Sequence, residues 1–171
     1  MEALNTLEEI KNVCLRSDKK LVTYISMGFG NPYKDPYDVS LVSKFVDVLM
    51  TLGTDVISIA DTIGVADPQN IHSLLSSLSK QFPAIEPGIH LHSTPQTAKE
   101  KIDAAYRAGC RRFDGAIRGY GGCPMANDAL VGNIATETIV SYLAEQGVAP
   151  GIDLKAFGEA QRLADTIFPA N

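Results

Sequence analysis

Apolar residues follow two different spacings along the chain. Short runs rich in β-branched residues, typical of strands, occupy 21–27, 56–60, 88–92 and 111–117. Around them, apolar residues recur every three or four positions, which predicts helices over 4–15, 38–52, 68–82, 95–109, 135–146 and 154–167. The order α-βα-βα-βα-βα-α predicts parallel strands joined by helices, and therefore an α/β fold.

Polar and reactive residues follow each predicted strand. An open doubly wound sheet and a (β/α)₈ barrel both fit the element order, and both gather functional groups at the carboxyl ends of their strands. The strands are followed by Asn31, by Asp61 and Thr62, by the pair His90 and His92, and by the stretch 118–123. The sequence thus predicts one functional edge.

Size and composition indicate one globular domain over residues 1–171. Hydrophobic residues make up 45% of the 171 positions, and the net charge is −5 with no basic stripe. We therefore expect no nucleic-acid partner and no membrane partner, since no apolar run approaches the roughly 20 residues of a membrane span. The first four residues lack the features of a secretory signal, and three widely spaced cysteines suggest free thiols, so we expect a cytoplasmic protein.

The histidine pair is a candidate metal site. His90 and His92 flank Leu91 in a predicted strand, and side chains two positions apart in a strand point to the same face. Two imidazoles do not name the metal: oxygen ligands added to them would suit Mg²⁺ or Mn²⁺, and thiolates would suit zinc. Two ordinary strand-end histidines that form local hydrogen bonds are the alternative.

Three further residues have two interpretations each. The Asp61 carboxylate either orients a ligand or caps the following turn, with Thr62 beside it. Asn133 follows a glycine and precedes a predicted helix, so it is either a helix N-cap or a neutral oxygen ligand. Cys123 follows Gly121 and Gly122 in a glycine-rich loop, where a thiol is placed to act as a nucleophile or proton donor rather than to pack.

Four segments resemble one family, the 3-hydroxy-3-methylglutaryl-coenzyme A lyases among the metal-dependent pyruvate-carboxyltransferase-like barrels. Residues 61–65, with the sequence Asp-Thr-Ile-Gly-Val, look like a family segment, and His90-Leu91-His92 is similar to its metal pair. Residues 119–124 resemble its cysteine loop, which is the most specific of the four, and residues 132–137 resemble the stretch that supplies an asparagine ligand.

The resemblance implies a carbon–carbon lyase that cleaves 3-hydroxy-3-methylglutaryl-CoA, or a similar acyl-CoA, to acetyl-CoA and acetoacetate. It implies a divalent cation, Mg²⁺ or Mn²⁺, held by His90, His92 and Asn133, and a catalytic set of Cys123, His90 and Asp61. Substrate-binding or loop residues are then Thr62, Arg118, Gly121, Gly122 and Glu137. Two alternatives remain: a related aldolase or condensing enzyme similar to citramalate or isopropylmalate synthases, and a non-catalytic half-barrel interaction module.

The resemblance covers only the C-terminal half of a (β/α)₈ TIM barrel, with four parallel βα units and flanking helices. The Arg-Asp pair and the glutamate that the family carries on its first two strands have no counterpart here, and Ser93 stands where the family usually has an aspartate. We therefore expect weak or absent lyase activity from this chain alone. We also expect a homo-oligomer or association with the missing N-terminal half.

Overall fold

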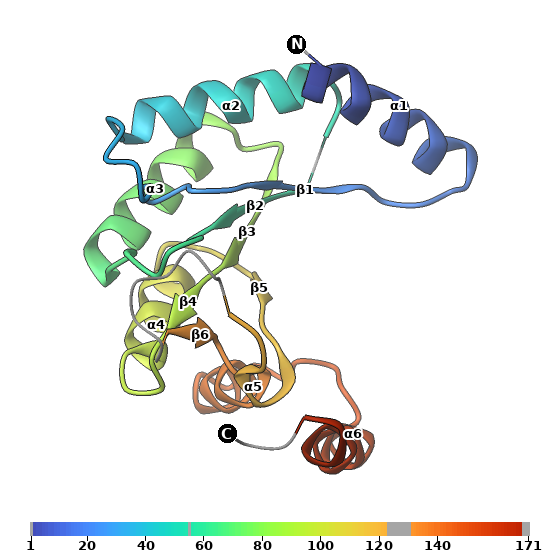
Figure 1. The fold of residues 1–171 in the computed structure, drawn as a ribbon, viewed down its shortest axis with the longest axis vertical. Coiled ribbons are helices and arrows are strands. Elements are labelled where there is room, and N and C mark those ends of the chain that lie inside the picture. Colours follow the sequence, from blue (N-terminus) through green and yellow to red (C-terminus); the bar gives the residue numbers. More distant parts are fainter. Residues whose placement is uncertain (1, 55, 123–130, 169–171) are drawn as a thin grey trace.

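The fold is α/β and is built on a four-stranded parallel sheet (Figure 1). The computed structural model describes residues 2–54, 56–122 and 131–168. The sheet has the order β1-β2-β3-β5, and its strands are β1 (Val22–Ile25), β2 (Val56–Ala60), β3 (Glu86–His90) and β5 (Arg112–Asp114). Two short antiparallel strands, β4 (His92–Ser93) and β6 (Gly132–Asn133), form a second sheet.

All six predicted helices are present. They are α1 (Glu2–Arg16), α2 (Val39–Thr51), α3 (Pro68–Gln81), α4 (Ala98–Arg107), α5 (Thr136–Glu145) and α6 (Leu154–Ile167), and a short 3₁₀ turn, η1, covers Ile117–Gly119. Local capping explains several of the boundaries. Asp67 and Asn70 form a capping box at the start of α3, where Pro68 has no amide hydrogen to satisfy.

The two faces of the sheet differ in chemistry. Strand alternation puts Ile57, Ile59 and Ile89 on the face that the helices cover, and all three are almost wholly buried. The opposite face carries Tyr24, which pairs in register with Ser58. The same register places Ser58 on this polar side, where it is wholly buried.

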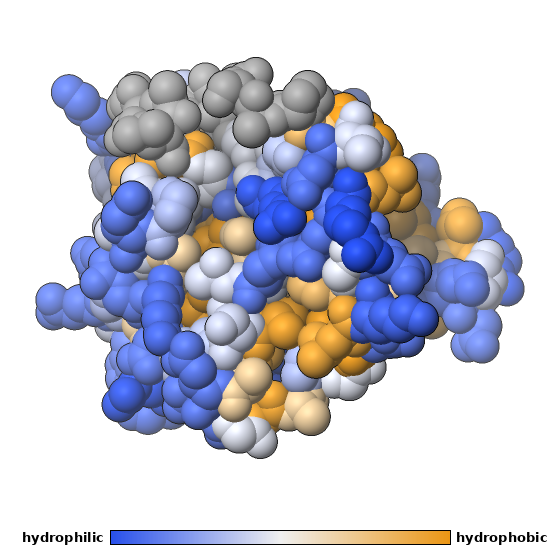
Figure 2. Space-filling view, turned by 90° about the horizontal axis from the view of Figure 1, so that it is seen from below, coloured by the Kyte–Doolittle hydropathy of each residue, from blue (hydrophilic) through white to orange (hydrophobic). Residues whose placement is uncertain are grey.

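The helices form an arc around the outer side of the sheet, with α1 at one end and α6 at the other (Figure 1). The remaining side of the sheet is open, as expected for half of a barrel. Seen from the α5 and α6 side, the surface shows apolar side chains between polar ones (Figure 2). Exposed large apolar residues on and next to α6 are Leu154, Leu163, Ile167 and Phe168. No helix in the described ranges is long and apolar enough to cross a membrane.

Candidate metal and substrate site

The two histidines lie together at the carboxyl end of the sheet. His90 ends β3, and His92 begins β4 one residue later, after the buried Leu91. Their ring centroids are 5.1 Å apart and the rings are nearly perpendicular, at 89°. Both line one open pocket of about 340 Å³, together with Tyr24, Ser26, Ala60 and Thr62. The two imidazoles therefore face the same space, as strand alternation predicts.

The ring of His92 is oriented by the backbone of a neighbouring strand end. Its Nδ1 lies 2.7 Å from the carbonyl oxygen of Asp61. A carbonyl oxygen only accepts, so Nδ1 carries the proton and donates, which leaves the lone pair of the neutral ring on Nε2. A hydrogen bond of this kind fixes the tautomer and orientation of a metal-binding histidine. The Ser93 side chain does not orient the His92 ring, because its hydroxyl forms hydrogen bonds with Thr94 and Thr97.

His90 is half-buried, and its titration fits the same use. Burial lowers the pKa of His90 below its ordinary value, and the nearby His92 lowers it further, whereas Asp114 and Asp61 oppose the shift. The ring is therefore neutral at neutral pH, and the neutral imidazole is the form that binds a metal ion.

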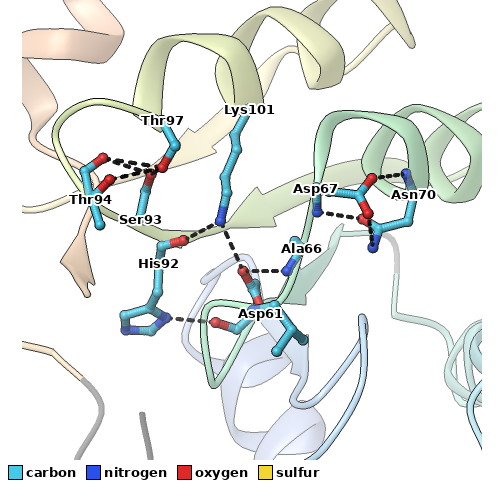
Figure 3. A network of polar contacts seen from close by, with 10 residues as sticks. Asp61, Ala66, Asp67, Asn70, His92, Ser93, Thr94, Thr97 and Lys101 are labelled. Atoms are coloured by element: carbon cyan, nitrogen blue, oxygen red, sulfur yellow. Dashed lines mark hydrogen bonds and ion pairs between the residues drawn. The ribbon is translucent and has the colours of Figure 1, made fainter. Parts of the chain in front are cut away.

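The Asp61 carboxylate points toward Ala66 and Lys101, while its carbonyl faces the ring of His92 (Figure 3). Asp61 does not line the histidine pocket. Its carboxylate accepts the backbone amides of Val65 and Ala66, at 2.9 and 3.0 Å. Its Oδ2 also lies 3.7 Å from Nζ of Lys101, which donates at 2.9 Å to the carbonyl of His92. The turn-capping interpretation thus matches the geometry, and Asp61 reaches the pocket through its carbonyl, as a positioning residue for His92.

Lys101 and Asp61 form a buried ion pair that sequence reasoning missed. Burial raises the pKa of Asp61, while Lys101 and the two amides act against that rise. Burial likewise lowers the pKa of Lys101, against the attraction of Asp61. A signal was available: Lys101 stands on the stripe of α4 that also buries Ala98 and Ala105.

The backbone of Asn133 lies next to that of His92, but the two residues line different pockets. The two residues are paired in the β4–β6 register. The Asn133 side-chain amide donates to the carbonyl of Tyr120 at 2.8 Å, and Asn133 lines a neighbouring pocket of about 160 Å³. It is not the N-cap of α5, since that position is Ala135. Its role as a third ligand stays a prediction.

The predicted substrate-binding residues are divided between the pocket and its surroundings. Thr62 lines the histidine pocket, and its hydroxyl accepts the backbone amide of Met27 at 2.8 Å. Arg118 instead forms a two-bond ion pair with Asp165 of α6, at 3.1 and 2.9 Å. The Glu137 carboxylate accepts the Arg118 amide and the Gln161 side chain.

The glycine loop reaches the edge of the described residues. Gly121 adopts a φ of +84°, which favours glycine, and Gly122 follows it on the surface. The predicted catalytic Cys123 lies outside the described residues.

A second polar cluster lies on the open face of the sheet around Asp114, which ends β5 in register with His90. The Asp114 carboxylate accepts the hydroxyls of Tyr24 at 3.0 Å and Ser58 at 2.7 Å. The Tyr24 ring stands edge-on to His90, with centroids 6.2 Å apart. Sequence reasoning did not single out these residues, although a polar residue within an otherwise apolar strand was visible at Ser58.

The donors on this chain fit a divalent cation in part. An oriented imidazole, a neutral imidazole beside it and an open pocket suit a borderline metal such as Mn²⁺. Within the described ranges, no cluster of three or more histidine, cysteine or acidic side chains could hold a metal. The described residues thus offer two imidazoles and nearby neutral oxygens at this point, without a carboxylate among the side chains that line the pocket.

A half-barrel of parallel βα units with polar residues gathered at its strand ends defines a class of fold, the (β/α)₈ type. The family model described as HMGL-like matches residues 5–164, and the chain belongs to this family.

Curated relatives are lyases that act on acyl-CoA compounds, according to their names. The hydroxymethylglutaryl-CoA lyase YngG of Bacillus subtilis is 32% identical over 154 residues, which cover 90% of this chain and 51% of that protein. The (R)-citramalyl-CoA lyase of Chloroflexus aurantiacus is 36% identical over 132 residues, which cover 77% of this chain and 41% of that protein.

Solved structures agree on the fold. The HMG-CoA lyase of Bacillus subtilis has a TM-score of 0.87 at 31% identity, and the match covers 96% of this chain and 55% of that one. An HMG-CoA lyase of Acinetobacter baumannii, in complex with coenzyme A and 3-methylmalate, has a TM-score of 0.81 at 29% identity and covers 96% and 53%. The chain thus spans about half the length of these relatives, which are TIM barrels.

Proposed function

We propose that this chain forms the metal-holding half of an acyl-CoA lyase that cleaves a carbon–carbon bond in 3-hydroxy-3-methylglutaryl-CoA or a similar 3-hydroxyacyl-CoA. The observation that carries the proposal is the pair His90 and His92 in one pocket, with His92 fixed by the Asp61 carbonyl at 2.7 Å. Membership of the HMGL-like family supports it.

His90 and His92 would hold a divalent cation, with Asn133 as the proposed third ligand. When bound, such an ion polarises the oxygens of a hydroxyl and a carboxylate and stabilises the charge that develops during cleavage. The protein's part is to present the two imidazoles to one pocket. The strand end is held in that geometry by the ion pair between Lys101 and Asp61 and by the hydrogen bonds to the carbonyls of His92 and Asp61.

Proton handling falls to groups around the pocket. Loss of the substrate hydroxyl proton leads to cleavage, and the enolate that leaves must then be protonated. We propose Cys123 as a participant in that second transfer, on the basis of the family resemblance of its loop. Gly121 and Gly122 would let the loop approach the pocket, since glycine reaches backbone conformations closed to other residues.

A related substrate is the second candidate. The (R)-citramalyl-CoA lyase of Chloroflexus aurantiacus is 36% identical over 132 residues. Citramalyl-CoA and 3-hydroxy-3-methylglutaryl-CoA both carry a tertiary hydroxyl and a carboxylate, so the same histidine pair would serve both. A lyase reaction on a CoA thioester is common to the two candidates.

Mn²⁺ titration monitored by electron paramagnetic resonance tests the site on the chain as it is. We expect His90→Ala and His92→Ala each to weaken Mn²⁺ binding by at least tenfold. His72→Ala, on the exposed face of α3, is the matched control and should leave binding unchanged. No binding by the parent chain, or equal losses in all three variants, would refute the metal site.

Release of acetyl-CoA from each thioester then distinguishes the two substrates. We expect little turnover by this chain alone, because the Arg-Asp pair and the glutamate of the family's first two strands have no counterpart in it. Robust metal-dependent cleavage by the isolated chain would show that expectation to be wrong.

A further inference from the structure

One hydrogen bond determines which way the Asn133 carboxamide faces. Its Nδ2 donates to the backbone carbonyl of Tyr120 at 2.8 Å. A carbonyl oxygen only accepts, so the nitrogen of the carboxamide faces Tyr120 and its oxygen points the other way. Asn133 and His92 are directly opposite in the antiparallel pairing of β4 and β6, and the side chains of such a pair project to the same face. The Tyr120 carbonyl therefore decides how the carboxamide oxygen is presented beside His92.

The segment 119–121 passes so close to Asn133 that its position sets this contact. A Cβ built on Gly119 would lie 2.8 Å from the carbonyl oxygen of Asn133, and one built on Gly121 would lie 3.1 Å from its Nδ2. The Gly121 carbonyl also accepts the backbone amide of Asn133 at 3.3 Å. A small displacement of this segment would therefore move the group that orients the carboxamide.

Helix α6 and its C-cap, Phe168, contact the same segment from outside the sheet. The ring of Phe168 lies 5.2 Å from the ring of Tyr120, measured between centroids. The carboxylate of Asp165 accepts two hydrogen bonds from the guanidinium of Arg118, at 3.1 and 2.9 Å. Asp165 and Phe168 are three positions apart and so share one side of the helix. Two contacts from one side of α6 thus hold the residues that lead to the Tyr120 carbonyl.

Arg118 adopts a backbone conformation that is unfavourable for a residue with a Cβ. Its φ is +57°, in the left-handed region. Such a conformation persists where the surrounding contacts determine it. Both oxygens of the Glu137 carboxylate lie 3.0 Å from the Arg118 amide, which donates to them. The amide of Arg118 is thus anchored on α5 and its guanidinium on α6, and together they fix η1, which immediately precedes Tyr120.

We propose that Arg118 and Asp165 are positioning residues for the Asn133 carboxamide. Their ion pair holds η1 against α6, η1 fixes the Tyr120 carbonyl, and that carbonyl orients the carboxamide of Asn133. A helix outside the sheet thereby acts on the candidate metal site without supplying a ligand. The inference deepens the proposed function, in which Asn133 is the third ligand, but the orientation itself can be measured without a metal ion.

Hydrogen exchange of the Asn133 side-chain amide tests the inference on the metal-free chain. Nuclear magnetic resonance measures the rate, and Asn133→Ser assigns the signal. Asp165→Lys sets a second positive charge against Arg118 and should speed this exchange at least fivefold. The double variant Arg118→Glu with Asp165→Lys restores a pair of opposite charges and should return the rate to within twofold of the parent. Glu159→Lys makes the same charge change at an exposed position of α6 and should alter the rate less than twofold.

Phe168→Ala provides a second arm that leaves every charge in place. It removes the ring that packs on Tyr120 and should speed exchange of the Asn133 carboxamide at least twofold. Unchanged exchange in both Phe168→Ala and Asp165→Lys would overturn the inference. So would equal effects of Asp165→Lys and Glu159→Lys, because the response would then reflect charge on α6 rather than the ion pair.

Mn²⁺ affinity in the same variants, measured by electron paramagnetic resonance, separates this inference from the proposed function. We expect Asp165→Lys to weaken Mn²⁺ binding at least threefold and the double variant with Arg118→Glu to restore it. Weaker Mn²⁺ binding with unchanged carboxamide exchange would overturn the inference. Faster carboxamide exchange with unchanged Mn²⁺ affinity would instead refute Asn133 as the third ligand, while the orienting role of the ion pair would stand.

Discussion

The ammonium group of Lys101 lies 3.7 Å from the carboxylate of Asp61, and the two side chains are 7% and 0% exposed. The same ammonium donates to the carbonyl of His92, whose ring donates to the carbonyl of Asp61 (Figure 3). One helix residue thus joins two strand ends beneath the candidate metal site. The pair links the stability of the fold to the geometry of the histidines.

Replacing Lys101 with methionine should destabilise the protein strongly. Lys101→Met leaves the Asp61 carboxylate buried with two amides and no opposite charge, which costs about 3–5 kcal/mol in the free energy of unfolding. Urea unfolding at neutral pH measures the loss. The double variant Lys101→Met with Asp61→Asn removes the unpaired charge and should recover part of the lost unfolding free energy. A loss below about 1 kcal/mol in the single variant would show that the pair is not a buried charge pair.

Removing the Glu137 carboxylate should loosen the end of the helical arc. Glu137 on α5 accepts the amide of Arg118 and the side chain of Gln161, so it ties η1 and α6 to α5. Hydrogen bonds to a charged group contribute about 1.5–3 kcal/mol. We expect Glu137→Ala to speed amide exchange at Arg118 and across α6. Glu159→Ala, an exposed position on α6, is the control. Equal exchange in both variants would contradict the role given to Glu137.

Removing the Asp114 carboxylate should destabilise the protein, because the Ser58 and Tyr24 hydroxyls both donate to it. Asp114→Ala leaves the wholly buried hydroxyl of Ser58 without its acceptor, at a cost of about 1–3 kcal/mol in unfolding free energy. Adding Ser58→Ala removes the stranded group, so the double variant should lose less than the two single losses combined.

The same substitution should also shift a tyrosine titration. Burial is the main cause that raises the pKa of Tyr24, and the hydrogen bond to Asp114 raises it further. Asp114→Ala should therefore lower the pKa of Tyr24 toward its ordinary value. Ultraviolet difference titration against Tyr24→Phe isolates this residue from the other tyrosines. An unchanged Tyr24 titration would mean that the Asp114 contact is not formed in solution.

The helices and strands could be predicted from the sequence because each is determined mainly by residues within the element itself. Apolar spacing and caps such as Asp67 act within one element, and the predicted helices and strands are all present. Strand β6 was missed, since a two-residue strand has no period and exists only through its pairing with β4. The prediction of half a TIM barrel rested on the family resemblance, and the matched structures confirm it.

The site was predictable where it depends on strand alternation and unpredictable where it depends on contacts between distant segments. Alternation placed His90 and His92 on one face. It did not reveal that the Asp61 carboxylate turns toward Lys101, 40 positions along the chain, or that Arg118 pairs with Asp165. Such contacts are formed only when helices pack, and no spacing in the sequence encodes them. The contacts of these side chains could therefore be assigned only from the structure.

Stability should fall in mildly alkaline solution because of Cys110. Burial raises the pKa of this thiol to about 11. In the folded protein the thiol donates to the backbone carbonyl of Arg112 at 3.1 Å. An unfolded thiol ionises near pH 8.5, so above that pH the unfolded state loses a proton that the folded state keeps. The contribution of Cys110 is thus fully present below about pH 8.5 and is lost as pH rises toward 11. At about 1.4 kcal/mol per pH unit, the fall amounts to roughly 3.5 kcal/mol at most.

Urea unfolding between pH 8 and 10.5 measures this effect in matched variants. Cys110→Ala loses stability from the small cavity at every pH, but its unfolding free energy should fall less steeply with pH than that of the parent chain. Cys14→Ala, at a half-buried position on α1, is the matched thiol substitution. Tyr37 and Tyr142, whose pKa values burial raises to about 12, are present in all three proteins, so their contribution cancels in the comparison. Parallel slopes in the parent and Cys110→Ala would show that the thiol ionises as easily in the folded protein as in the unfolded one.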